Sequence, residues 1–179
     1  GNYDIISSSF TNPSLDINFL DKSRNLVTEK KLPETGQIEA VALGDINKDG
    51  LVDLIYTTEK FGDDKLVIQT NQNNNNFSRK EIKLNSASEE LVLVDLDNNG
   101  FLDIVITEFN SKGIIWFKNT NGLFNEKSTI LGTESIFALK GEDLDKDSNL
   151  DLVYLENMNF DSINIVVLKG LGTGKFDPK

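Results

Sequence analysis

The stretch Asp45-Ile-Asn47-Lys-Asp49-Gly50-Leu-Val-Asp53 decides how this chain is read, because close variants of it occur twice more. The second copy is Asp95-Leu-Asp-Asn-Asn-Gly-Phe-Leu-Asp103, and the third is Asp143-Leu-Asp-Lys-Asp-Ser-Asn-Leu-Asp151. The first aspartates of the copies lie 50 and then 48 residues apart. A fixed period of this size is typical of a repeat architecture.

Each copy has oxygen-bearing side chains at its positions one, three and five, which is the pattern of a loop that curls around a calcium ion. Position seven would add its backbone carbonyl, and position nine would return a carboxylate. Mg²⁺ fits less well, since it prefers strict octahedral geometry and keeps its waters. We predict about three Ca²⁺ ions per chain, with ligands at Asp45, Asn47, Asp49, Leu51, Asp53, Asp95, Asp97, Asn99, Phe101, Asp103, Asp143, Asp145, Asp147, Asn149 and Asp151.

The third loop is the weakest match to the pattern. Ser148 stands at position six, where the first two loops have Gly50 and Gly100 to allow a sharp turn. Asn149 tolerates the left-handed conformation, so we expect it to make the turn instead. Metal is expected to bind in this loop as well.

Two other kinds of site share parts of this pattern. An EF-hand or a dockerin opens in the same way, but it needs an acidic ligand at position twelve, where this chain has Tyr56, Ile106 and Tyr154. A pair of catalytic carboxylates is also conceivable, as in a glycosidase. An active site is normally built once, so three similar arrays favour structural calcium over catalysis; loops that bind nothing are the remaining alternative.

Short runs of β-branched, aromatic and leucine residues flank every loop, which indicates strands in place of helices. The expected strands are 38–43, 90–94 and 136–139 before the loops, and 53–57, 103–107 and 151–155 after them. Third strands follow at 66–70, 114–118 and 163–168, and more polar fourth strands at 78–84 and 126–131. Four short antiparallel strands per period predict the blade of an all-β propeller.

The start of the chain fits the same period, because Asp4 aligns with Asp53. We predict a propeller segment of about four blades, each a four-stranded antiparallel sheet except the first, and the last with a short outer strand. The units are a partial blade at 1–36, holding strands two to four behind a half-missing loop, and blades at 37–86, 87–133 and 134–179. Since a propeller needs roughly 4–8 blades, further blades or self-association would close the ring; a compact four-bladed ring is the alternative.

Composition excludes several classes of function. The chain has no cysteine and no histidine, so disulfides, thiolate nucleophiles, imidazole ligands and a Ser-His-Asp triad are ruled out. A net charge of −11 argues against a nucleic-acid partner. No apolar run reaches the ~18 residues of a membrane span, and the first residues show no signal-peptide pattern.

A few other residues invite a functional reading. Trp116 stands among apolar strand residues, which predicts a place in the core rather than in a ligand site. Phe61 and Phe109 fall in polar segments between strands, where an exposed ring stacks readily on a sugar. The glycines at 170–174 lie on a hairpin with no following helix, so they do not form a phosphate-binding loop.

The three loops, each preceded by a strand and followed by an aspartate and two hydrophobic residues, resemble the FG-GAP/VCBS repeats of the integrin α-subunit propeller and of bacterial surface and secreted proteins. Ser148, Asn99 and the low repeat number depart from that pattern. The resemblance implies calcium between the first two strands of each blade and an extracellular or cell-surface location. We expect a non-enzymatic adhesion module for a protein or glycan ligand, or alternatively a carbohydrate-targeting propeller attached to a secreted polysaccharide-degrading enzyme.

Overall fold

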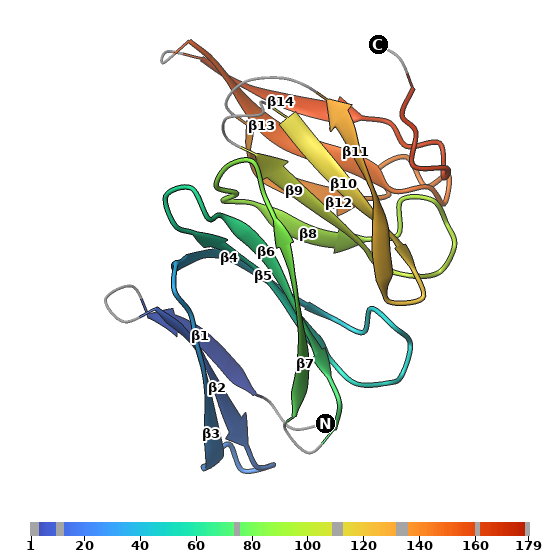
Figure 1. Cartoon of the computed structure of the whole chain (residues 1–179). Coiled ribbons are helices and arrows are strands. Elements are labelled where there is room, and N and C mark those ends of the chain that lie inside the picture. Colours follow the sequence, from blue (N-terminus) through green and yellow to red (C-terminus); the bar gives the residue numbers. More distant parts are fainter. Residues whose placement is uncertain are drawn as a thin grey trace.

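The computed structural model of the chain describes residues 4–9, 13–73, 76–108, 113–131, 136–159 and 162–177. In these residues the regular secondary structure is β-strand, and no helix occurs. The strands form four antiparallel sheets that follow one another in chain order (Figure 1). The predicted all-β repeat fold is therefore confirmed.

Each sheet adds its strands in sequence, so that every strand pairs with the one before it. The first sheet contains β1 (Ile5–Ser9), β2 (Ser14–Leu20) and β3 (Leu26–Pro33). The second contains β4 (Gln37–Gly44), β5 (Asp53–Glu59), β6 (Lys65–Asn71) and β7 (Phe77–Lys83). The third contains β8 (Leu91–Val94), β9 (Asp103–Glu108), β10 (Gly113–Thr120) and β11 (Leu123–Leu131).

The fourth sheet differs from the prediction of four strands per complete blade. It contains β12 (Ile136–Glu142), β13 (Asp151–Asn159) and β14 (Ser162–Leu168). The expected outer strand is reduced to an isolated bridge between Gly170 and Phe176. The residues between these two form a turn.

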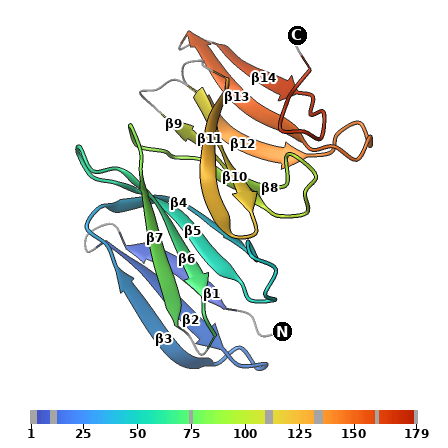
Figure 2. The ribbon, with the colours of Figure 1, turned by 45° about the vertical axis from the view of Figure 1, so that its right-hand side comes forward.

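The innermost strands bring neighbouring sheets together. Strand β4 contacts β8, and β8 contacts β12, while β1 and β2 contact β4. The N-terminal and C-terminal sheets lie at opposite ends of the row in both views (Figures 1 and 2). The row is thus propeller-like but does not close into a ring.

Apolar side chains fill the space between each pair of sheets. Because side chains alternate along a strand, Leu54 and Tyr56 face the first sheet while Ile55 faces the third. The layer between the third and fourth sheets holds Val105 and Ile114 with Tyr154, and Trp116 packs against it. The predicted core position of Trp116 is confirmed, and each sheet depends on its neighbours for burial.

Within the described residues, no helix has the length and apolarity that a membrane-spanning helix requires.

Candidate metal centres

Each acidic loop connects the innermost strand of its sheet to the next strand. The loops at 45–53, 95–103 and 143–151 lead from β4 to β5, from β8 to β9 and from β12 to β13. Position one comes directly after the inner strand, and position nine is the first residue of the following strand. The sheet therefore fixes the two carboxylates at opposite ends of the loop.

The three loops share a backbone shape, with positive φ at positions four and six. The φ angles are 59° at Lys48, 54° at Asn98 and 63° at Lys146 for position four, and 83° at Gly50, 86° at Gly100 and 72° at Ser148 for position six. Sequence reasoning foresaw position six because of its glycines. It missed position four, where two of the residues are lysines that do not favour this conformation.

The prediction that Asn149 makes the turn of the third loop is wrong. Ser148 itself adopts the left-handed conformation, and its N–H donates to Asp143 Oδ2 at 3.0 Å. Gly50 and Gly100 make the same bond, at 2.8 and 2.7 Å, to Asp45 and Asp95. This anchoring bond is common to all three loops, so the carboxylate at position one holds position six in place whichever residue stands there.

The aspartate at position nine is buried beneath each loop. Asp53, Asp103 and Asp151 are 0%, 0% and 2% exposed. One oxygen of each accepts the N–H of position two, and the other accepts an N–H at the end of the third strand. The first distances are 3.0, 3.1 and 3.1 Å from Ile46, Leu96 and Leu144, and the second are 2.8, 2.7 and 2.9 Å from Asn71, Asn119 and Gly170.

Burial raises the pKa of Asp103 to about 6, although its two backbone N–H donors lower it. Burial also raises the pKa of Asp53. The charged form of a carboxylate in such a position is disfavoured unless an opposite charge lies close by. A cation held in the loop would provide that charge.

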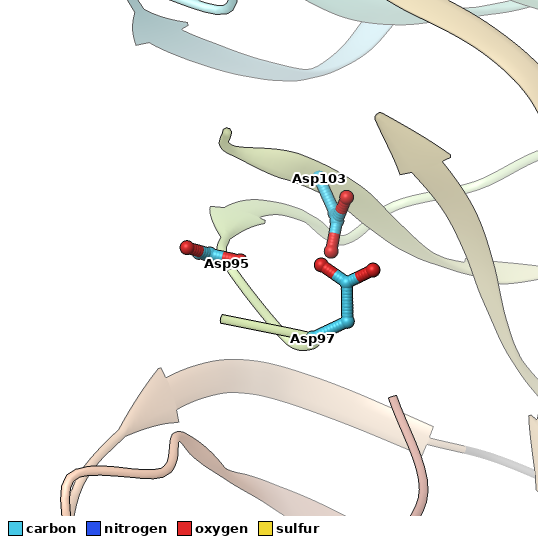
Figure 3. A group of neighbouring side chains, drawn as sticks. All are labelled: Asp95, Asp97 and Asp103. Atoms are coloured by element: carbon cyan, nitrogen blue, oxygen red, sulfur yellow. The ribbon is translucent and has the colours of Figure 1, made fainter. Parts of the chain in front are cut away.

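Carboxylates converge in the second and third loops. Oxygens of Asp95, Asp97 and Asp103 all lie within 4.8 Å of one another, and so do those of Asp143, Asp145 and Asp151. Figure 3 shows Asp97 and Asp103 extending toward one another, with Asp95 beside them. Asp97, a member of the first of these groups, has an oxygen, Oδ1, that is buried without a hydrogen-bond partner. An all-oxygen cluster with an unpaired buried carboxylate oxygen fits a hard cation such as calcium.

Position five is engaged in a different way from positions one, three and nine. The Oδ1 atoms of Asp49, Asn99 and Asp147 accept the N–H of position seven at 2.8, 2.8 and 2.9 Å. Asp147 is not part of the convergent group in its loop. In the first loop, Asn47 at position three donates its amide N–H to Asp49 Oδ2 at 2.9 Å. Metal contacts from position five and from the position-seven carbonyls stay predictions, as do those from positions one, three and nine.

Two lysines that sequence reasoning missed lie against the loops. Lys118 Nζ is 2.8 Å from Asp97 Oδ2, and Lys169 contacts the carboxylates of Asp145 and Asp147. Both lysines directly precede the residue whose N–H binds the buried aspartate. The equivalent residue in the second sheet is Thr70, where position three of the loop is the neutral Asn47. A lysine is therefore present where position three is charged and absent where it is not.

The loops also touch one another through positions four and seven. Lys48 Nζ lies 4.4 Å from the centroid of the Phe101 ring in the second loop. Asn98 Nδ2 donates to Asn149 Oδ1 in the third loop at 2.9 Å. In the first two loops the left-handed residue at position four thus reaches forward to the next loop.

Asn119 joins the second and third sheets beneath the loops. It is fully buried, and its Nδ2 donates to the carbonyls of Ile46 at 2.8 Å and Leu102 at 2.7 Å. Ile46 belongs to the first loop, so this side chain connects one loop to the sheet that follows it. The only sequence signal for Asn119 is that the repeat places it at the same position as Asn71, the other asparagine at the end of a third strand.

Of the two aromatic residues predicted to contact sugars, one lies among the described residues. Phe61 lies fully exposed in the turn between β5 and β6. Phe109 lies outside the described residues. Tyr56 and Tyr154 are buried between sheets, in agreement with a packing role.

The fold and these sites together define a β-propeller-like repeat module with an acidic loop in three of its four sheets. A family model described as FG-GAP-like repeat matches residues 45–106 and 95–154, which together cover more than half of the chain. The chain belongs to the FG-GAP-like repeat family, as the sequence motifs indicated. A comparison with curated proteins finds no match.

Proposed function

We propose that this chain is a calcium-binding propeller module without catalytic activity, which presents a rigid face to a protein or glycan ligand. The observation that carries the proposal is the cluster of Asp95, Asp97 and Asp103, with its buried, unpaired Asp97 Oδ1. A bound calcium ion would supply positive charge to this oxygen and to buried Asp103. The same arrangement at Asp143, Asp145 and Asp151 supports more than one such ion.

The residues also support a structural rather than a catalytic role for the carboxylates. The loops share their backbone shape and anchoring bonds, and the chain offers no histidine or cysteine to act beside them. A site repeated in this way fits ions that make the loops rigid better than it fits a catalytic centre, which is normally built once. We propose that such a module works outside the cell or on its surface, where calcium is abundant enough for sites of modest affinity.

The outer face of the fourth sheet carries exposed apolar side chains that a further blade or a second copy of the chain could cover. Ile163, Ile165 and Val167 on β14 are 61%, 73% and 42% exposed, whereas Val166 and Leu168 on the same strand are buried against the third sheet. The equivalent faces of the second and third sheets are each covered by the next sheet. We propose that additional blades or a second copy cover this face, as open repeat arrays require.

A calcium titration by calorimetry, with the bound metal counted on the same sample, tests the proposal. We expect about three ions per chain, from the ligand pattern of calcium loops. Asp95→Asn removes a position-one carboxylate and is expected to lower that number by one. The control is Glu29→Gln, which removes the same charge from an exposed residue of β3. If the unchanged chain binds no calcium, the proposal is wrong. It is also wrong if Asp95→Asn and Glu29→Gln bind the same number of calcium ions.

Lys118 is expected to weaken calcium binding by the second loop, because its ammonium group competes for Asp97. Replacing Lys118 with threonine, the residue at the equivalent place in the second sheet, should raise the affinity of that loop by about two- to fivefold, the size of a partly exposed ion pair. The gain should shrink at high salt. Lys22→Thr, on an exposed hairpin, is the matched control. Equal affinities in both variants would contradict the competition.

A further inference from the structure

Hydrogen bonds connect the buried aspartates of the three acidic loops in one continuous series. Each position-nine aspartate accepts an N–H from position two of its own loop and another from the end of the third strand of its sheet. In the third and fourth sheets, the residues at this end also donate to the carbonyl of position two in the preceding loop. Position two is thus held both by its own loop and by the following sheet.

The link between the first and second loops passes through Asn119. Its backbone N–H donates to Asp103 Oδ1 at 2.7 Å, and its side-chain Nδ2 donates to the carbonyl of Ile46 at 2.8 Å. The N–H of Ile46 in turn donates to Asp53 Oδ2 at 3.0 Å. All four residues are buried, so water does not compete for these bonds. Asp103 of the second loop is therefore joined to Asp53 of the first.

The link between the second and third loops uses the glycine-rich turn that begins at Gly170. The N–H of Gly170 donates to Asp151 Oδ1 at 2.9 Å, and the N–H of Gly174 donates to the carbonyl of Leu96 at 2.9 Å. The N–H of Leu96 then donates to Asp103 Oδ2 at 3.1 Å. The series thus continues from Asp103 to Asp151.

The glycines of this turn permit its close approach to the loops. A Cβ atom at Gly170 would collide with the carbonyl of Leu150 in the third loop, and one at Gly174 would collide with the ring of Trp116. At Gly172, where φ is 65°, a Cβ atom would meet the amide groups that join the second and third loops. The Gly-x-Gly-x-Gly sequence therefore serves the contact between this turn and two acidic loops.

Neighbouring sites share groups that a bound ion would order. An ion would fix the position-nine carboxylate of its own loop, which holds the N–H of position two. The carbonyl of that position-two residue holds a donor from the following sheet, and the same end of that sheet binds the next position-nine carboxylate. Once the shared groups are ordered by a first ion, a second ion binds with a smaller loss of conformational entropy.

We propose that the three acidic loops bind calcium cooperatively, because this series of hydrogen bonds couples each site to its neighbour. The inference rests on the proposed calcium function and adds that the sites fill together. Coupling between sites is reciprocal, so each loop strengthens its neighbour by the same factor by which the neighbour strengthens it. A module of this kind responds more steeply to calcium than three independent sites would.

A calcium titration followed by NMR tests the coupling. The amide signals of Gly50 and Gly100 report the first two loops separately, because each N–H bonds to the position-one carboxylate of its own loop. Asp45→Asn removes a predicted ligand of the first loop and should raise the calcium concentration at half-change of the Gly100 signal by about fivefold, near the lower end of usual couplings. Asp95→Asn should shift the Gly50 signal by the same factor. Glu29→Gln, on an exposed residue of β3, should shift neither signal.

A change at Asn119 tests whether the coupling follows the hydrogen bonds. Asn119→Leu keeps the backbone N–H and the approximate size of the side chain but removes the bond to Ile46. Leucine already occupies the equivalent place in the first sheet, at Leu20. In the Asn119→Leu protein, Asp45→Asn should no longer shift the Gly100 signal.

Two controls show that the effect belongs to this link. Asn71→Leu makes the same change in the second sheet, where the side chain donates to a carbonyl in the loop of its own sheet, so the fivefold shift should persist. Asp143→Asn should still shift the Gly100 signal in the Asn119→Leu protein, because the third loop is linked through Gly174. High salt in all titrations keeps the repulsion between bound ions small.

The outcomes separate this inference from the proposed function. A Gly100 signal that responds at the same calcium concentration with and without Asp45→Asn would overturn the coupling and leave calcium binding in place. A shift that persists in Asn119→Leu would overturn the hydrogen bonds as its route; Asn119→Gly, with the residue of the fourth sheet at this place, serves if the leucine variant does not fold. Loop signals that do not respond to calcium at all would overturn both the proposed function and the coupling.

Discussion

Excess calcium is expected to raise the midpoint of thermal unfolding by roughly 15–30 °C over the same protein in chelator. A ligand at 100 times its dissociation constant stabilises the folded state by about 2.7 kcal/mol per site. Three loops together would contribute about 8 kcal/mol, and each kcal/mol shifts the midpoint of a chain of this length by ~2–4 °C. The physical source is the relief of charge among Asp95, Asp97 and buried Asp103, and among Asp143, Asp145 and Asp151 in the third loop.

The measurement is differential scanning calorimetry against chelator, in calcium at about 100 times the dissociation constant found by titration, which is near 0.1–1 mM for sites of extracellular modules. Magnesium at the same concentration is the control, and it should give a clearly smaller shift because the loops do not impose octahedral geometry. A calcium shift no larger than the magnesium shift would mean that the loops do not hold a specific ion.

Much of the fold could be predicted from the sequence, because two independent signals coincide. The alternation of oxygen side chains marks where a loop begins and ends, and the apolar runs on either side of it mark two strands. The period then transfers each assignment to the other repeats, so that even Asp4 could be placed from its distance to Asp53. The hydrogen bond from Leu20 to Asp4 repeats the one that fixes Asp103, in agreement with that placement.

The contacts around the loops could not be predicted, because they depend on which residues meet across sheets. Lys118 reaches Asp97 from the third strand of the sheet, and nothing in the spacing of the motif points to it. Asn119 contacts Ile46 from 73 residues away. The turn at Ser148 was misassigned for a related reason: the bond from its N–H to Asp143 outweighs the intrinsic preference of Asn149.

Replacing the leucine at position two of an acidic loop is expected to have the second large effect, on the free energy of unfolding. The chain has a leucine at this position in two loops, buried in one and exposed in the other. Leu96 is 3% exposed beneath the fourth sheet, and Leu144 is 51% exposed on the last loop. Leu96→Ala is expected to lower the free energy of unfolding by about 3 kcal/mol, since it leaves a cavity in the layer between sheets. Leu144→Ala should change it by no more than about 0.5 kcal/mol, as exposed substitutions do.

Chemical denaturation of both variants in the same calcium concentration measures this difference directly. Both variants replace leucine by alanine at the same position of a loop, so the change in backbone preference is the same in both and cancels when they are compared. What remains is the contribution of the sheet that packs on Leu96, which is the energy that joins one repeat to the next. An equal loss in both variants at low protein concentration would contradict the exposed state of Leu144. A loss at Leu144 that appears only at high concentration would instead identify a second copy as its cover.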